Sequence, residues 1–420
     1  MIRPFYSLVM SGAQPFLRHK LHRRGVAEPG YLQNIDERFG LYPGRSEAGR
    51  IWIHAVSLGE TRAAAILLDE LRAQQPGVRV LLTHGTATGR AEGERLLQAG
   101  DAQAWLPWDT PQAVLRFLQH FRPRIGVLME TEVWPNLAAG CVEQGVALVL
   151  ANARLSEKSM RQALRLSPLS RPAYGALSAT WAQTQADARR LARVGASVSG
   201  VFGNLKFDAA PDPQQLARGR QWRRQLARPV VMFASSREGE ELAFFHAMAQ
   251  EKAHSGGVQW LLVPRHPQRF DEVAALAAQH GLSVSRRSSW EVGPQPADVW
   301  LGDSLGEMAL YYGMADAALL GGSFEPLGGQ NLIEAAASGC PVVMGPHTFN
   351  FADAAQLAEE AGAALRVQSM ADAVRTAVAL AAGPKQQAEV AAAGLAFAAA
   401  HRGAAQKTAA ALLALVNGPS

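Results

Sequence analysis

The chain has 420 residues, of which 48% are apolar and 18% charged, and its formal net charge is +5. This length exceeds what one hydrophobic core usually serves, so we expect two domains, and the composition excludes a disordered protein. Cys141 and Cys340 each lie among apolar residues without a partner at metal-ligand spacing, which disfavours a disulfide framework and favours a reducing compartment. No apolar run reaches the roughly 18 residues of a spanning helix, and no cleavable signal peptide is apparent.

The first 24 residues combine an apolar segment, Pro4 to Leu17, with a basic cluster, Arg18 to Arg24. An apolar segment that abuts basic residues suits the surface of an anionic membrane. An ordinary N-terminal helix packed on its own domain accounts for the composition equally well, so both interpretations stay open.

Short apolar runs alternate with helical patterns through the first half. We expect strands over Ile51–Val56, Val78–Thr83, Ala104–Trp108, Ile125–Met129, Ala147–Asn152 and Ala179–Gln183. Amphipathic stretches such as Thr61–Gln74 and Pro111–Phe121 lie between them. This alternation predicts a parallel sheet covered on both faces by helices. Because ligands bind at the carboxyl ends of such strands, the loops that follow strands are the candidate functional segments.

Glu60 follows the first expected strand, beside Gly59. A carboxylate in a strand-to-helix loop can act as a general base toward a hydroxyl. A first-turn glutamate that merely complements the helix dipole is the commoner situation and is favoured by position alone. The two interpretations also conflict electrostatically, because a helix N-terminus lowers a carboxylate pKa whereas a strong base needs it raised.

Two further strand ends carry charged residues. Glu130 and Glu132 follow the strand ending at Met129, and on an extended segment they point opposite ways, so we expect one to reach the cleft and the other to cap the helix starting near Pro135. Lys206, near the end of the first half, can neutralise a carboxylate or phosphate of a substrate. A solvated lysine between domains is the open alternative.

The second half repeats the alternation after a turn-rich linker placed near residues 207–220. We expect strands over Val230–Ser235, Trp260–Val263, Val299–Leu301, Ala317–Leu320, Pro341–Met344 and Ala364–Val367. Two such series predict two Rossmann-like domains with a cleft between them. The last 30 or so residues are alanine-rich and helical and could pack on either domain.

Several strand ends in this half carry groups that suit anions. They are Ser235–Glu238, Pro264–Pro267 and Asp303–Met308. In the segment from Gly321 to Pro346, the paired glycines Gly321-Gly322 and Gly328-Gly329 would let backbone N–H groups approach a ligand closely. Asn331 and Glu334 share one helix face there, and a carboxylate suits the two hydroxyls of a ribose. The segment predicts a nucleotide site.

Absent motifs narrow the nucleotide. The sequence has neither a GxGxxG after a strand nor a GxxxxGK[ST], which disfavours dinucleotide oxidoreductases and P-loop enzymes. It has no Asp-x-Asp and no His/Cys cluster at metal spacing. A leaving group with little charge to neutralise, such as a nucleoside monophosphate, fits this better than a diphosphate.

The motifs, in this order, resemble those of the 3-deoxy-D-manno-oct-2-ulosonic acid (Kdo) transferases of Gram-negative lipopolysaccharide synthesis. The matching segments span nearly the whole chain: HAVSLGE (54–60), METEVWPN (129–136), GNLKFD (203–208), PRHPQRF (264–270), GDSLGEM (302–308) and GGSFEPLGGQNLIE through MGPHTFNF (321–351). Gln330 stands where the family often has histidine and Ala335 where it often has proline, both beside the expected donor site.

The resemblance implies an α/β GT-B glycosyltransferase that needs neither metal nor cofactor. The donor would be CMP-Kdo and the acceptor a lipid A precursor at the cytoplasmic face of the inner membrane, with no nucleic acid partner. The resemblance makes Glu60 the general base, against the simpler interpretation, and Glu130 and Lys206 its catalytic partners. With the loops above, the expected donor-binding residues are Ser236, Arg265, His266, Leu305, Gly306, Glu307, Gly322, Ser323, Gly329, Asn331 and Glu334.

These expectations divide the chain as follows: a membrane-association segment at 1–24, an acceptor domain at 25–207, a linker at 208–220, a donor domain at 221–400 and a C-terminal helix at 401–420. The N-terminal segment is shorter and more polar than the family's usual anchor, which favours peripheral attachment. A related enzyme using a UDP-sugar and a non-enzymatic membrane scaffold are the rival hypotheses, and the acids at strand ends argue against the scaffold.

Overall fold

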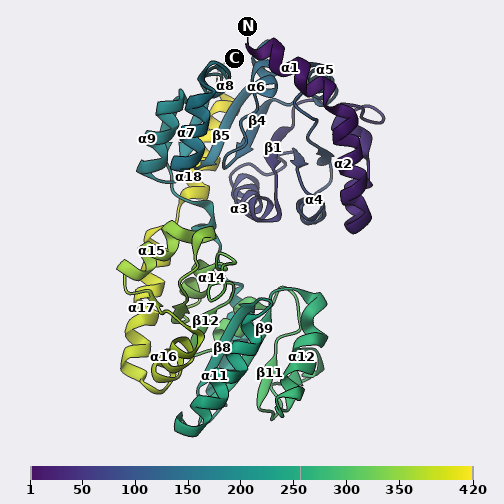
Figure 1. The fold of residues 1–420 in the computed structure, drawn as a ribbon. Coiled ribbons are helices and arrows are strands. Elements are labelled where there is room, and N and C mark those ends of the chain that lie inside the picture. Colours follow the sequence, from purple (N-terminus) through teal and green to yellow (C-terminus); the bar gives the residue numbers. More distant parts are fainter. Residues whose placement is uncertain (1, 256, 419–420) are drawn as a thin grey trace. The chain divides into compact units, whose positions relative to one another are not determined.

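The computed structural model describes residues 2–255 and 257–418 and divides the chain into two compact units. The first contains the chain up to Asp208 and again from Arg402 onward, and the second runs from Ala209 to His401 (Figure 1). Each unit is an α/β structure built on one parallel sheet of seven strands.

The sheet of the first unit has the strand order β3-β2-β1-β4-β5-β6-β7. Its strands are β1 (Ile51–Ala55), β2 (Val80–His84), β3 (Ala102–Trp105), β4 (Ile125–Met129), β5 (Ala147–Ala153), β6 (Ala179–Ala182) and β7 (Val198–Val201). In register, Ile53 pairs with Leu82 of β2 and Val127 of β4. The chain runs outward from β1 to β3 and then returns to β4, so the direction reverses between β1 and β4. Ligand sites of such sheets lie at this switch point.

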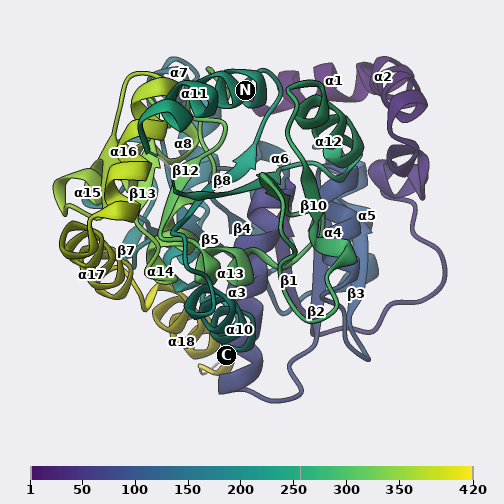
Figure 2. The same cartoon turned by 90° about the horizontal axis from the view of Figure 1, so that it is seen from below.

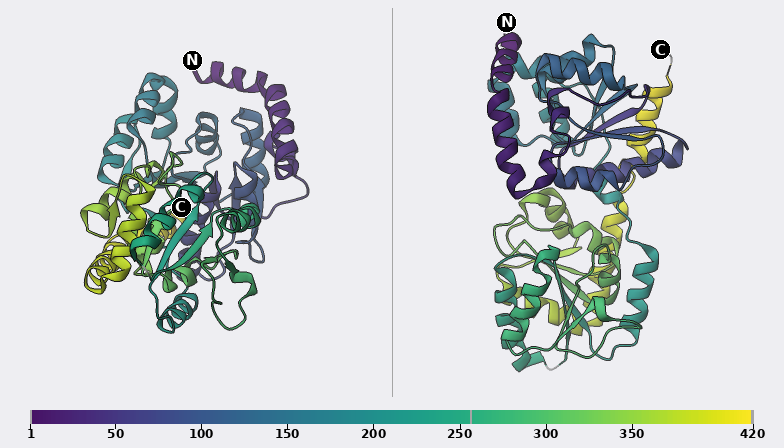
Figure 3. Two further views of the ribbon diagram at one scale, coloured as in Figure 1. Left: turned by 60° about the horizontal axis from the view of Figure 1, so that its bottom comes forward. Right: turned by 90° about the vertical axis from the view of Figure 1, so that its right-hand side faces the viewer.

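Helices cover both faces of the first sheet. They are α1 (Ile2–Gly12), α2 (Gln14–Ala27), α3 (Leu58–Gln74), α4 (Ala87–Glu94), α5 (Pro111–Phe121), α6 (Pro135–Glu143), α7 (Glu157–Arg165), α8 (Ser167–Gly175), α9 (Gln185–Val194) and α18 (Ala404–Asn417). One apolar core joins α3 and α18 to the sheet, and a second core on the other face joins α5, α6, α8 and α9. Helices α1 and α2 run along the outside of this unit (Figure 3).

The sheet of the second unit has the order β10-β11-β9-β8-β12-β13-β14, with its switch point between β8 and β12. Its strands are β8 (Val230–Ser236), β9 (Gln259–Pro264), β10 (Val284–Arg286), β11 (Val299–Leu301), β12 (Ala317–Leu320), β13 (Val342–Met344) and β14 (Ala364–Arg366). The two neighbours of β8 are β9 and β12, so the turns that follow these three strands emerge side by side.

The second sheet is also covered by helices. They are α10 (Pro213–Arg224), α11 (Glu240–Ser255), α12 (Phe270–Gln279), α13 (Met308–Met314), α14 (Leu332–Ala337), α15 (Ala352–Glu360), α16 (Met370–Ala382) and α17 (Pro384–Ala400). An apolar core joins α11, α12 and α16 to one face of the sheet. Elsewhere in the unit, α10 packs beside α13, and α14 beside α17 (Figure 2).

The twelve strands expected from the sequence are all present, and two edge strands were missed. β7 contains Gly200 and exposes two of its four residues, and β10 has only three residues. Both lie at a sheet edge, where one neighbouring strand is absent and a continuous apolar run is not needed.

The expected linker at 208–220 differs from the structure. Helix α10 begins inside it, at Pro213, with Asp212 as its N-cap accepting from the Gln214 and Gln215 amides. The Asp-Pro pair that suggested a turn is therefore a helix start. The C-terminal helix α18 packs on α3 of the first unit.

Asp208 caps α18. Its carboxylate accepts hydrogen bonds from the Gly403 amide and, at 2.7 Å, from the Ala405 amide. Gly403 itself has a left-handed φ of 100°, which suits a residue without a side chain. The last residue of the first segment of the unit is thus fastened to the start of the second.

Replacing Asp208 by alanine should loosen α18, because a lost N-cap typically costs about 0.5–2 kcal/mol. We expect the amides of residues 404–417 to exchange with deuterium several-fold faster, measured by mass spectrometry, while other helices keep their protection. Asp353→Ala, an exposed first-turn acid of α15, serves as the control. Unchanged protection of α18 in Asp208→Ala would contradict the capping role.

Candidate active site

Glu60 lies in the first turn of α3, directly after the switch-point strand β1. Its carboxylate accepts a hydrogen bond from the Val56 amide at 2.8 Å and one from the Ser57 hydroxyl at 3.2 Å. Ser57 in turn accepts from the Glu60 amide, so the pair forms a variant of the capping box in which Glu60 binds the amide of the preceding residue, Val56, and not that of the N-cap. The simpler role expected of a first-turn acid is therefore real.

The same carboxyl group is nevertheless weakly acidic. Burial raises the pKa of Glu60 to about 7, although the Val56 amide opposes the shift, and the negative charges of Glu130 and Glu132 raise it further. Burial and like-charge repulsion thus outweigh the hydrogen bonds from Val56 and Ser57 that favour the charged form, so a first-turn acid can still have a raised pKa. A carboxylate with this pKa is suited to accept a proton near neutral pH.

The backbone of Val56, whose amide binds Glu60, is itself held by the turn after β2. Its carbonyl oxygen accepts hydrogen bonds from the Gly85 amide at 3.0 Å and from the Thr86 amide at 2.9 Å, and a third from the Thr86 hydroxyl. A Cβ atom on Gly89 would lie 3.2 Å from this oxygen, so the turn after β2 packs directly on the turn that carries Glu60. Thr86 and Gly89 were missed by the sequence analysis.

Glu130 follows β4, on the other side of the switch point. It adopts a left-handed φ of 59°, is 8% exposed, and its Oε1 atom lies 3.3 Å from the Nζ atom of Lys206. Lys206 sits in a short 3-10 helix, Leu205–Asp208, whose first amide donates to the Asn152 side chain at 3.0 Å. Asn152, also left-handed with φ 51°, is buried at the end of β5 and was another missed residue.

Glu132 was expected to cap α6 if Glu130 reached the site, and this was wrong. Asp109 accepts from the amides of Asn136 and Leu137 at the start of α6 instead. Glu132 accepts from the Trp134 indole at 2.8 Å, and its charge acts on Glu60. Both acids of the segment therefore lie near Glu60, because Glu130 is left-handed and the segment is not the extended strand assumed for the alternation. The first unit brings Glu60, Glu130 and Lys206 together.

In the second unit, the glycine-rich turn after β12 differs from the expected ligand cradle. The Gly321 amide donates to the Ala234 carbonyl at 2.8 Å, Gly322 to the Glu240 carboxylate at 2.7 Å, and Gly329 to the Gly322 carbonyl at 2.7 Å. These backbone groups hold the turn together. Gly322 and Gly329 are left-handed, with φ of 68° and 75°, which explains the glycines without a ligand.

Two serines of the expected donor set are likewise internal. Ser323 is fully buried, and its hydroxyl donates to the Leu320 carbonyl and accepts from the Gly345 amide. Ser236 is 1% exposed and donates to the Glu241 carboxylate at 2.8 Å. Both hydroxyl groups are therefore engaged in hydrogen bonds within the protein that fix turns.

The turn after β9 carries two cationic groups of the expected donor site, Arg265 and His266. The Arg265 amide donates to the Ser236 carbonyl at 3.0 Å, which seats this turn beside the one after β8. His266 is exposed, and its pKa is lowered by partial burial and by the positive charges of Arg237, Arg265 and Arg269. Arg237, in the turn after β8, therefore belongs to the same basic cluster, although it was not among the expected donor-binding residues.

The residues Leu305, Gly306 and Glu307 form the turn before α13. Leu305 is 70% exposed, and Gly306 is left-handed with φ 79°. Glu307 is bound by the Arg287 guanidinium at 2.7 Å and by the Ser304 hydroxyl. Its carboxylate thus shapes the turn, and the Gly306 carbonyl accepts from the Gln215 side chain, which leaves Leu305 as the exposed side chain.

Asn331 and Glu334 lie at the start of α14. Asn331 is the N-cap, accepting from the Ile333 amide at 3.1 Å, and Glu334 follows in the first turn. Burial raises the pKa of the Tyr312 phenol well above its usual value, the Glu334 charge raises it further and the Arg265 charge opposes this. The charges of Arg265 and Glu334 therefore both act on one buried hydroxyl, so the basic cluster and the α14 helix start lie within electrostatic range of Tyr312.

Among residues 2–255 and 257–418, no group of three or more His, Cys, Asp or Glu is arranged to hold a metal ion. Cys141 and Cys340 are buried and unbridged, and burial raises the pKa of Cys141 to about 12. Neither thiol is therefore ionised near neutral pH.

Comparisons with known proteins place the chain in a family. The family model described as 3-deoxy-D-manno-octulosonic-acid transferase (kdotransferase) matches residues 33–209. The 3-deoxy-D-manno-octulosonic acid transferase of Bordetella pertussis is 47% identical over 421 residues, covering 97% of this chain and 98% of its own length. That of Haemophilus influenzae is 33% identical over 386 residues and covers 90% of each chain.

A solved structure supports the architecture alone. The glycosyltransferase from Rickettsia africae is 12% identical and matches 89% of this chain and 100% of its own, with a TM-score of 0.57. The fold is thus the α/β GT-B fold with two Rossmann-like units, as expected. With nearly half of its residues identical to the Bordetella protein over almost the entire length, the chain belongs to the 3-deoxy-D-manno-octulosonic acid transferase family.

Proposed function

We propose that this protein transfers Kdo from CMP-Kdo to a sugar hydroxyl of a lipid A precursor, with inversion at the anomeric carbon and without a metal ion. Family membership supports the transferred sugar. The observation that carries the mechanism is Glu60, a carboxyl group with a pKa of about 7 at the switch point of the first sheet, near the Glu130–Lys206 pair.

In this proposal Glu60 is the general base. Its carboxylate takes the proton of the acceptor hydroxyl while that oxygen bonds to the anomeric carbon of Kdo. The bond between this carbon and the CMP phosphate breaks, and its electron pair leaves with CMP. A base with a pKa near the working pH combines a useful deprotonated fraction with real proton affinity.

Lys206 supplies a positive charge beside the reacting sugar, and Glu130 fixes it. Kdo carries a carboxylate, and an ammonium group is a suitable partner for one. The 3.3 Å ion pair with Glu130 and the anchoring of the adjacent amide by Asn152 limit where the ammonium group lies. Such pre-orientation of charge lowers the cost of reaching the transition state.

The second unit would hold CMP. Arg265 and His266, together with Arg237, form the basic cluster that suits the phosphate. Glu334 suits the ribose hydroxyls, and its charge and that of Arg265 both act on Tyr312, which supports a single site for the ribose and the phosphate. The exposed Leu305 and the peptide groups of its turn would pack against the cytosine ring of CMP.

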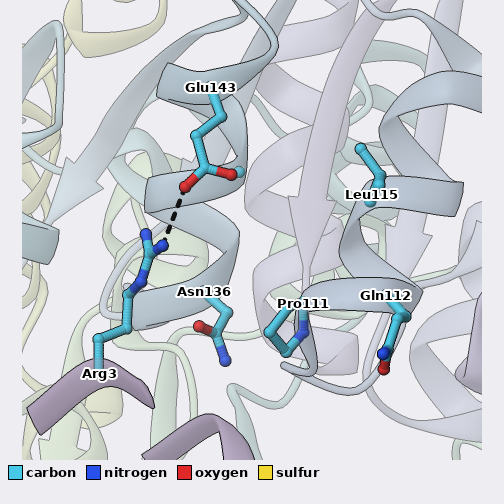
Figure 4. A pocket seen from close by; sticks show the side chains of 7 residues that line it. Arg3, Pro111, Gln112, Leu115, Asn136 and Glu143 are labelled. Carbon is cyan, nitrogen blue, oxygen red and sulfur yellow. Dashed lines mark hydrogen bonds and ion pairs between the residues drawn. The ribbon is translucent and has the colours of Figure 1, made fainter.

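The N-terminal helix α1 supports attachment to a membrane surface. Its apolar side chains Phe5, Leu8 and Val9 are 67%, 70% and 52% exposed. Polar contacts fasten the helix to its unit: Arg3 pairs with Glu143 of α6 at 2.9 Å, as Figure 4 shows, and the Tyr6 hydroxyl donates to Asp109.

Asp109 also binds the first amides of α6, directly after the segment that carries Glu130 and Glu132. Hydrogen bonds through Asp109 thus connect α1 to the start of α6, next to the proposed acceptor site. The exposed basic residues 18–20 and 22–24 follow α1 in the sequence. We propose peripheral attachment to the anionic cytoplasmic face of the inner membrane. Within the described ranges, no helix is long and apolar enough to cross a bilayer.

Replacing Glu60 by glutamine should abolish most turnover. The amide oxygen can still accept from Val56, so the fold persists, but the proton acceptor is lost, and general-base catalysis typically contributes about 10²–10⁴-fold. Release of CMP and the mass of the product would be measured with CMP-Kdo and a tetra-acylated lipid A precursor. Glu70→Gln, on the same helix, should behave as the wild type, and near-normal turnover of Glu60→Gln would refute the assigned base.

The pH dependence of kcat/KM, which reports the pKa values of the free enzyme, should follow Glu60. Activity should rise with pH through about 7 as the carboxyl group loses its proton. Glu132→Gln removes a negative charge that raises this pKa, so its acidic limb should move to lower pH. Rates of CMP release would be compared from about pH 5 to pH 9. A limb that stays in place would show that Glu132 does not act on the base.

Serine at both Phe5 and Leu8 should weaken binding to vesicles that contain anionic lipid. Each buried apolar side chain contributes about 1.5–3 kcal/mol, so the loss should exceed about tenfold, measured by vesicle co-sedimentation. Turnover of a water-soluble acceptor without acyl chains should be unchanged. Leu166→Ser, which changes another exposed leucine of the same unit, should bind normally, and equal binding by the double variant would exclude α1 as the attachment face.

A further inference from the structure

Glu240 is a buried acid that the proposed mechanism does not use. It is the first residue of α11, directly after the switch-point strand β8, and is 1% exposed. A buried carboxylate is costly unless hydrogen bonds compensate for the lost hydration, so its partners reveal its purpose.

Three backbone amides from two turns bind this carboxylate. Its Oε2 atom accepts from the Arg237 amide at 3.0 Å and from the Gly322 amide at 2.7 Å, and its Oε1 atom accepts from the Phe324 amide at 3.1 Å. Arg237 belongs to the turn that begins α11, and a contact with it alone would be ordinary helix capping. Gly322 and Phe324 belong to the glycine-rich turn after β12, 82 and 84 residues further along the chain.

The turns after β8 and β12 pack directly against each other, backbone to backbone. A Cβ atom on Gly321 would lie 2.2 Å from the Ser235 carbonyl oxygen, so the backbones are in direct contact. Ser235 itself is left-handed, with φ 56°, where the register of β8 against β9 shifts. The close approach depends on Gly321, and the Glu240 carboxylate satisfies the amides that the approach buries.

The neighbouring acid, Glu241, fastens the third turn. It accepts from the Ser236 hydroxyl at 2.8 Å and from the Arg269 guanidinium at 2.7 Å. The Arg269 amide donates to the His266 carbonyl at 3.0 Å, which links this contact to the turn that carries Arg265 and His266. Two adjacent carboxylates thus tie together the turns after β8, β9 and β12.

We infer that Glu240 is a positioning residue of the donor site: it locks the glycine-rich turn and occupies the amides that would otherwise receive the donor phosphate. The inference rests on the proposed function. A phosphate at the Gly322 amide would have to displace a buried carboxylate and would lie beside its negative charge. The phosphate is therefore directed to the side chains of Arg237, Arg265 and His266, and Glu240 sets their distance from the α14 helix start.

The test compares Glu240→Gln with the wild type. Glutamine has one carbonyl oxygen in place of two carboxylate oxygens, so it cannot serve the amides of both Gly322 and Phe324 in the present geometry. We expect the KM for CMP-Kdo to rise about tenfold, with a smaller thermal stabilisation by CMP and an unchanged KM for the acceptor. The amides of residues 321–325 should exchange with deuterium faster.

A second variant separates positioning from general stability. Ser369→Ala removes the N-cap of α16, in the same unit, and should lower Tm while leaving the KM for CMP-Kdo unchanged. If Glu240→Gln likewise lowers Tm alone, its role is merely structural and the inference is overturned.

Measurements on the wild-type protein test the proposed function separately from the role of Glu240. A wild-type protein that neither consumes CMP-Kdo nor is stabilised by CMP would refute the donor assignment, and the inference with it. An active wild type together with an unchanged donor KM in Glu240→Gln would overturn the inference alone.

Discussion

Both units depend on a carboxylate that is bound by backbone N–H groups at the switch point of a parallel sheet. Glu60 follows β1 and accepts from the Val56 amide, and Glu240 follows β8 and accepts from the amides of Arg237, Gly322 and Phe324. Parallel strands deliver their turns to one sheet edge, where the turns crowd together and expose backbone N–H groups. An acid in the first turn of the next helix, half-buried in the case of Glu60 and buried in that of Glu240, satisfies these donors and helps to set the spacing of the turns.

The number of amide donors separates the two carboxylates in function. Three amides occupy three of the roughly four acceptor sites of the Glu240 carboxylate, so this group can hold turns but has little capacity left for a substrate proton. Glu60 has one amide and one hydroxyl partner, and the charges of Glu130 and Glu132 add to the effect of burial, giving a pKa of about 7. The same position after a strand thus serves as a clamp in one unit and is suited to proton transfer in the other.

Most of the fold was predictable, because buried parallel strands leave continuous apolar runs such as Ile125–Met129. The strands β7 and β10 were not, since edge strands need no such runs. For the site, strand ends indicated Glu60, Glu130 and Lys206, but not Asn152, whose left-handed backbone at the end of β5 has no local signature. The glycine-rich turn was located correctly, but its glycines permit close backbone packing, and the Gly322 amide, expected to face the ligand, is bound by Glu240.

The sequence by itself determined the two α/β units, the loops that carry the functional groups and, through its motifs, the family. Apolar periodicity and turn residues encode these features locally, so they can be read without coordinates. Only the tertiary structure decided which groups bind each acid and how far its pKa is shifted, because a carboxyl pKa depends on burial and on charges from distant segments. Glu132, expected to cap a helix, instead acts on Glu60, and Ser323, expected to face the donor, is buried within its own turn.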